Sequence, residues 1–142
     1  MSNEELSSVR HSCAHLLAAA VEALYPDAKR AIGPAIENGF YFDFDFGSAK
    51  PSDEDLPRIE EKMREIVASW HAFERKEVSA EEARAFFATN PYKLELINEF
   101  AAEGQTLTLY TSGTYTDLCR GGHSEAPNKD LLHFKLLSLA GA

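Results

Sequence analysis

The sequence has few cysteines and no long apolar run, and each shortage excludes a class of protein. Cys13 and Cys119 are the only cysteines in the 142 residues. We expect them to stay reduced, since a disulfide is improbable in the cytoplasm. The chain begins with polar, acidic residues, unlike the basic and apolar start of a signal peptide. No apolar run approaches the roughly 20 residues that cross a bilayer. We therefore expect a cytoplasmic protein with no membrane partner.

Basic residues are also scarce. Lys and Arg total 14 against 23 Asp and Glu, which gives a formal net charge of −9. This balance argues against a domain that grips a long stretch of nucleic acid through its phosphates. Any nucleic-acid contact should be small and local, or be supported by another domain.

The hydrophobic pattern predicts one α+β domain, an antiparallel sheet packed with helices. The chain is long enough for a real core, with 44% hydrophobic and 26% charged residues. Helices are predicted over residues 9–24, 56–70, 79–89 and about 91–104. Strands are predicted over residues 40–46, 73–78 and the hairpin 106–118. Residues 1–8 should be a flexible N-terminus, and the apolar stretch 131–139 fits either a strand or a helix.

Four side chains near the ends of the chain suit metal ligation or acid–base chemistry. His11 and His15 are four residues apart, as are Cys119 and His123. On the first predicted helix the two imidazoles share one face, away from the centre of the apolar stripe. They should therefore line a shared polar site or face solvent. Three imidazoles and a thiol form a complete tetrahedral zinc set, or the wall and acid–base groups of a hydrolytic pocket. The spacing alone does not decide between them.

Short motifs along nearly the whole chain resemble the editing domain of bacterial threonyl-tRNA synthetases and, more distantly, that of alanyl-tRNA synthetases. The similar segments occur in order at residues 11–17, 32–34, 38–41, 91–93, 117–121, 133–136 and 140–142. Their number and order make the resemblance far more specific than either histidine motif. One departure is Gly122, where that family usually has proline.

The resemblance implies an aminoacyl-tRNA deacylase that proofreads serine mischarged on threonine tRNA. Serine lacks one methyl of threonine, and a missing methyl supplies only about 1–3 kcal/mol of discrimination, so a second, hydrolytic sieve is needed. Residues that match the family's catalytic set are His11, Lys93, Cys119, His15 and His123. Residues that match its substrate-binding set are Asp117, Gly121, Gly122 and Tyr92.

The same resemblance suggests a role for each of the main side chains. His11 and Lys93 would position or activate the attacking water, and the ammonium would stabilise the developing oxyanion. Asp117 would hold the amino group or hydroxyl of the substrate. Cys119, His15 and His123 would shape the pocket and orient the ester.

The resemblance also bears on cofactors and leaves two other functions open. Alanyl-type editing domains bind zinc with such a quartet, whereas the threonyl type edits without zinc, so we predict no cofactor. His11, His15, Cys119 and His123 remain the candidate zinc ligands. One alternative is zinc-dependent trans-editing of mischarged alanine tRNA. The other is a non-catalytic domain that binds zinc or a partner.

By this resemblance residues 1–142 form an editing domain without the ubiquitin-like, catalytic and anticodon-binding domains of the full synthetase. The chain alone should not aminoacylate tRNA, because the ATP site and the catalytic zinc belong to the synthetic core. The expected partners are the 3′ aminoacylated end of threonine tRNA and the remaining domains of the synthetase.

Overall fold

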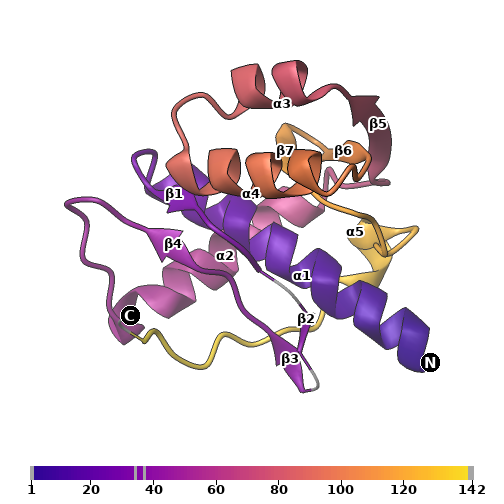
Figure 1. Cartoon of the computed structure of the whole chain (residues 1–142). Helices are drawn as coiled ribbons and strands as arrows, with labels where there is room; N and C mark the ends of the chain where they lie inside the picture. Colours follow the sequence, from indigo (N-terminus) through magenta and orange to yellow (C-terminus); the bar gives the residue numbers. More distant parts are fainter. Residues whose placement is uncertain (1, 34, 37, 141–142) are drawn as a thin grey trace.

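Two crossing helices, α1 and α2, form the centre of the molecule (Figure 1). The computed structural model describes residues 2–33, 35–36 and 38–140. Helix α1 spans Asn3–Leu24, and the Ser2 side chain caps its N-terminus. Residues 3–8, for which we expected a flexible terminus, form its first turns. Helix α2 spans Leu56–Val67, with its proline in the first turn as predicted. Within the described residues, no helix combines the length and the apolar character that a membrane span requires.

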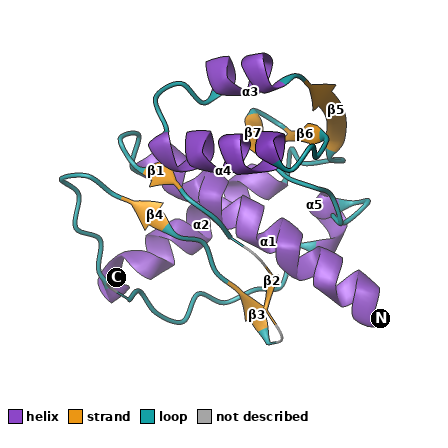
Figure 2. Cartoon of the chain, in the orientation of Figure 1, coloured by secondary structure: helices purple, strands orange, loops and turns teal. Residues whose placement is uncertain are grey.

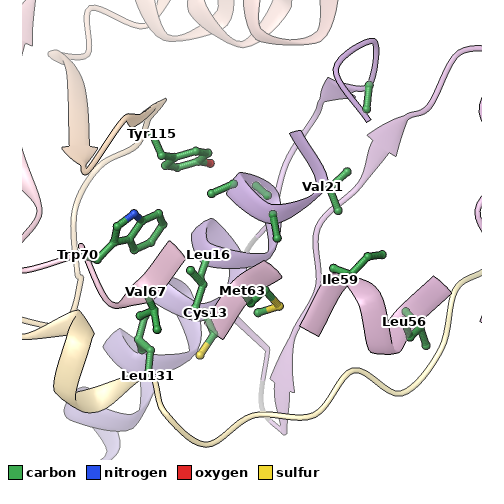
Figure 3. Packing of buried hydrophobic residues seen from close by; sticks show 14 residues of the cluster. Cys13, Leu16, Val21, Leu56, Ile59, Met63, Val67, Trp70, Tyr115 and Leu131 are labelled. Atoms are coloured by element: carbon green, nitrogen blue, oxygen red, sulfur yellow. The ribbon is translucent and has the colours of Figure 1, made fainter. Parts of the chain in front are cut away.

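The main core lies between these two helices (Figure 3). Leu16 and Val21 on α1 meet Ile59 and Met63 on α2, and all four are almost completely buried. Trp70 follows α2 and is equally buried. The apolar stripes read from the sequence are therefore the faces that the two helices bury against each other.

A three-stranded antiparallel sheet lies beyond α1 in the order β5–β6–β7. The strands are β5 (Glu74–Val78), β6 (Leu107–Ser112) and β7 (Tyr115–Leu118). Helices α3 (Ala80–Phe86) and α4 (Pro91–Ala102) cover it around a second apolar cluster (Figure 2). The predicted capping box of Ser79 is present. Helix α3 ends earlier than residue 89, because the chain turns there so that Asn90 can cap α4.

The phenylalanine-rich segment was predicted as one strand and is instead broken into two. The short strands of this region are β1 (Lys29–Arg30), β2 (Ala35–Ile36), β3 (Gly39–Phe40) and β4 (Phe44–Asp45). β1 pairs with β4 and β2 with β3, both antiparallel. The phenylalanines at 40, 42, 44 and 46 are half-buried against the core and alternate with exposed residues, so the predicted alternation is confirmed. A Cβ on Gly33 would clash with the Phe42 ring, so this position requires glycine.

The last segment is neither strand nor helix after the short helix α5 (Pro127–Asp130). Its backbone N–H groups donate to side-chain carboxylates of α2 and of the 3₁₀ turn η1 (Asp53–Asp55), rather than to a neighbouring strand. The Leu136 N–H donates to Glu60 at 2.7 Å, and the Leu139 N–H donates to Asp53 at 2.9 Å. Residues 34 and 141–142, part of the similar segments named above, lie outside the described residues.

Candidate functional site

The two motifs from opposite ends of the chain meet in one cluster. His11 and His15 project from α1, while Cys119 follows β7 and His123 ends the loop after it. Their ligand atoms all lie within 4.8 Å of one another. Nε2 of His11 is 3.2 Å from Nε2 of His15 and 3.3 Å from Sγ of Cys119. The same Sγ is 3.3 Å from Nε2 of His123.

The loop of residues 119–123 depends on two glycines. Gly121 and Gly122 have φ of 105° and 85°, in the region that residues with a Cβ avoid. A Cβ on Gly121 would also lie 2.7 Å from the hydroxyl of Tyr110. The carbonyl of Gly122 accepts a hydrogen bond from Nδ1 of His11 at 3.2 Å. The glycines thus allow the loop to close onto α1.

Burial keeps two of the imidazoles neutral at physiological pH. Burial, together with the neighbouring His15, lowers the pKa of His11 to about 4. Burial, together with the other two histidines, lowers the pKa of His123 to about 3. His123 also stacks on Phe73, with ring centroids 4.3 Å apart, which fixes its orientation. Both side chains therefore present neutral nitrogens to the cluster.

Cys119 is a protonated thiol in this setting. Burial raises its pKa to about 11, so almost no thiolate is present at neutral pH. Because the thiolate is the reactive form, the free cluster holds a thiol that donates a hydrogen bond to an imidazole rather than an activated nucleophile. The other cysteine, Cys13, lies in the main core.

A buried carboxylate stands behind the cluster. Asp117 is 1% exposed, and its Oδ2 accepts a hydrogen bond from the Tyr115 hydroxyl at 2.7 Å. That hydroxyl is 3.1 Å from Nδ1 of His15, which is also buried rather than solvated. Lys93 is buried as well, with Nζ 3.0 Å from Oδ1 of Asp117. Oδ1 also accepts the Leu118 N–H at 2.8 Å. A substrate group that binds Asp117 has to displace one of these partners.

Arg30 is a member of the site that the sequence did not suggest. It is buried on β1, and its Nη1 is 3.4 Å from Oδ2 of Asp117. Burial alone would raise the pKa of Asp117, but Lys93, His15 and Arg30 outweigh it and hold that pKa well below its ordinary range. No local pattern could indicate Arg30, because Asp117 is far away along the chain.

Tyr92 lies apart from the contacts that define the cluster. Its side chain is 37% exposed, and its hydroxyl donates to Asp45 on β4 at 2.7 Å. The hydrogen bond therefore ties α4 to the β1–β4 hairpin. Lys93, the next residue, is buried, and its backbone N–H donates to the Asn90 side chain that caps α4.

The cluster has the donor set and the spacing of a zinc site. Around a tetrahedral zinc ion, nitrogen and sulfur ligands lie roughly 3.3–3.6 Å apart; three donor pairs here are 3.2–3.3 Å apart, and the whole set lies within 4.8 Å. Nδ1 of His11 donates to a carbonyl. Nδ1 of His15 donates to Tyr115, whose own proton goes to Asp117. With Nδ1 of both rings engaged in this way, Nε2 of each ring is directed at the cluster. These four residues can therefore hold a metal ion.

The chain is similar over nearly its whole length to part of the threonine–tRNA ligases. It is 50% identical to the enzyme of Staphylococcus carnosus over 141 residues and 48% identical to that of Streptococcus suis over 140 residues. It is 51% identical to that of Thermotoga neapolitana over 136 residues. These alignments cover 99%, 99% and 94% of the chain but only 21% of each enzyme. No protein-family model matches the chain.

Proposed function

Because the chain corresponds to a segment of the threonine–tRNA ligases, we propose that it is their proofreading domain, which hydrolyses the ester of serine mischarged on threonine tRNA. The observation that carries this proposal is the cluster itself. Three imidazoles and a thiol, drawn from both ends of the chain, lie within 4.8 Å of one another beside a buried Lys93–Asp117 pair.

His11 is the general base in this proposal. It is half-exposed, whereas His15 behind it is buried, so a water can reach only the first of the two without rearrangement. Its Nδ1 proton is engaged by the Gly122 carbonyl, which leaves the lone pair on Nε2. With a pKa of about 4, the ring is neutral at physiological pH and accepts the proton of the attacking water.

Lys93 supplies the positive charge that ester hydrolysis requires. The carbonyl oxygen of the ester becomes an oxyanion in the transition state, and a preorganised cation stabilises it strongly in a buried site. Lys93 is 3% exposed and shares Asp117 with His15, so it lies one carboxylate away from the cluster.

The walls of the cluster act as the sieve. His123 is stacked on Phe73 and tilted against Tyr110, so the ring has little freedom to move. Gly121 and Gly122 bring the main chain close to the ester. In this proposal, a wall with so little freedom favours serine over threonine, because overpacking by the additional methyl of threonine is costly.

The expected partners follow from the same proposal. The domain contacts the 3′ aminoacylated end of threonine tRNA, in the cytoplasm, and the remaining domains of the synthetase hold the body of the tRNA. A net charge of −9 fits such a division, because this segment by itself offers little attraction to phosphates.

A zinc-dependent hydrolase is the second candidate, favoured by the convergence of four nitrogen and sulfur donor atoms within 4.8 Å of one another. His11, His15, Cys119 and His123 would hold the ion, which would supply a Lewis acid. Trans-editing of mischarged alanine tRNA belongs to this candidate. It predicts that chelation abolishes hydrolysis.

The proposal is tested by deacylation of threonine tRNA that carries either serine or threonine. The 142-residue chain should hydrolyse the seryl ester much faster than the threonyl ester. His11→Ala should lose about 100-fold or more of the rate, as expected for a general base. Equal rates for the two esters, or full activity in His11→Ala, would contradict the proposal.

A further inference from the structure

Asp117 has two cationic partners inside the protein rather than one. Lys93 lies on one oxygen, with Nζ 3.0 Å from Oδ1, and Arg30 lies on the other, with Nη1 3.4 Å from Oδ2. Both cations are buried, at 3% and 8% exposed. Arg30 also pairs with the more exposed Glu22, so its contact with Asp117 gives the buried carboxylate a second cation in addition to Lys93.

The two cations differ in how firmly the structure holds them. The guanidinium of Arg30 donates from Nη1 to the Thr116 carbonyl at 2.8 Å and lies over the Tyr115 ring at 4.9 Å. Its Nε is also 3.4 Å from Glu22. Lys93, in contrast, is a single ammonium on a flexible stem. Asp117 is its ion-pair partner, and its Nζ lies 5.5 Å from the centroid of the Phe42 ring.

We infer that Arg30 is a positioning residue for the proposed hydrolysis, because it keeps Asp117 paired while the Lys93 ammonium turns from the carboxylate to the ester. This inference rests on the proposed function. A buried carboxylate that loses its only cation is strongly destabilised. With Arg30 fixed in place, Asp117 keeps a cation and Lys93 is released to the substrate at little cost.

The charged residues around Asp117 are consistent with separate roles for Arg30 and Lys93. Glu22, Arg30, Asp117 and Lys93 alternate in sign, with successive contacts of 3.4, 3.4 and 3.0 Å. Glu22, at 42% exposed, opens onto a hollow of about 590 Å³ that Arg30 and Tyr115 also line. Arg30 thus lies between the more exposed carboxylate of Glu22 and the buried carboxylate of Asp117. The proposed role does not require Arg30 to contact the substrate.

Steady-state hydrolysis of seryl-tRNA by Arg30→Met and Arg30→Lys tests the inference. In Arg30→Met, Lys93 becomes the one Lys or Arg among the described residues that pairs with Asp117, so kcat should fall about tenfold or more while KM changes little. Arg30→Lys restores a cation and should recover a large part of kcat. Arg75→Met, which changes an exposed arginine on β5, should match the unaltered chain. An unchanged kcat in Arg30→Met, or no recovery in Arg30→Lys, would overturn the inference.

A thermal unfolding cycle separates this inference from the proposed function, because it needs no substrate. Arg30→Met should lower Tm clearly in the unaltered chain and much less in an Asp117→Asn background, where Arg30 no longer has the buried Asp117 carboxylate to pair with. Equal losses of Tm in the two backgrounds would overturn the pairing. Absence of seryl-tRNA hydrolysis by the unaltered chain would instead contradict the proposed function. The thermal unfolding cycle would still test whether Arg30 pairs with Asp117.

Discussion

Single side chains in this protein acquire their chemistry from burial. His15 lies on a face of α1 that the helical pattern left open to solvent or a polar site, and it is buried beneath Tyr115. Asp117 and Lys93, which resemble surface residues in the sequence, are an almost fully buried ion pair. In each case the residue that contacts the buried side chain comes from a distant part of the chain, so the local sequence does not indicate the burial.

Replacement of Lys93 by methionine tests its role directly. The change keeps the length of the side chain but removes the charge, so kcat for seryl-tRNA should fall about 100-fold or more through loss of oxyanion stabilisation. Tm should also fall, though Arg30 still pairs with Asp117. Lys76→Met, at an exposed position of β5, serves as the control. A Lys93→Met chain that keeps normal kcat would show that the ammonium takes no part in hydrolysis.

The elements of the fold were predicted where local signals are strong. The capping box of α3, the proline in the first turn of α2 and the apolar face of α1 are encoded within a few residues and are confirmed. The strand over residues 40–46 was predicted whole and is broken, because its two parts pair with different strands, β2 and β1, in different registers. Residues 131–139 bind to carboxylates instead of forming an element.

The loop of residues 119–123 is the element on which the cluster depends. Gly121→Ala should shift it, because the new Cβ would lie 2.7 Å from the Tyr110 hydroxyl at a φ of 105°. We expect loss of most hydrolysis together with a lower Tm. Gly47→Ala, at a φ of 64° with no atom within 4 Å of the new Cβ, should carry only the backbone cost of about 1 kcal/mol and keep its activity.

Measurement of seryl-tRNA hydrolysis and Tm on the two glycine variants distinguishes loop geometry from general destabilisation. If both variants lose activity in proportion to their loss of Tm, the loop has no special role. If only Gly121→Ala loses activity, the position of the loop against α1 is what the reaction needs.

At the scale of the whole molecule, the cluster makes folding sensitive to acid. The native pKa values of His11 and His123 are lowered to about 4 and about 3 from an ordinary value of 6.5. Between about pH 6.5 and about pH 4 the unfolded chain therefore binds protons that the folded chain does not, and the free energy of unfolding decreases as the pH falls. Asp117, whose native pKa is held below its ordinary value of 3.8, adds to this loss mainly as the pH approaches 4 and below.

The prediction is a Tm that falls steadily from about pH 7 to about pH 5 and falls less in His123→Gln, which lacks one of the two groups. Thermal unfolding followed by circular dichroism at each pH measures it. A Tm that stays constant over this range, or the same slope in both chains, would mean that the histidines are not held neutral in the folded protein.

The most direct measurement is the single-turnover hydrolysis of seryl-tRNA for threonine by the chain after exhaustive chelation, with its metal content determined in the same sample. The cluster of His11, His15, Cys119 and His123, with Lys93 beside it, predicts that the metal-free chain hydrolyses the seryl ester and spares the threonyl ester. No hydrolysis until zinc is restored, or no hydrolysis under either condition, would contradict a metal-independent editing site.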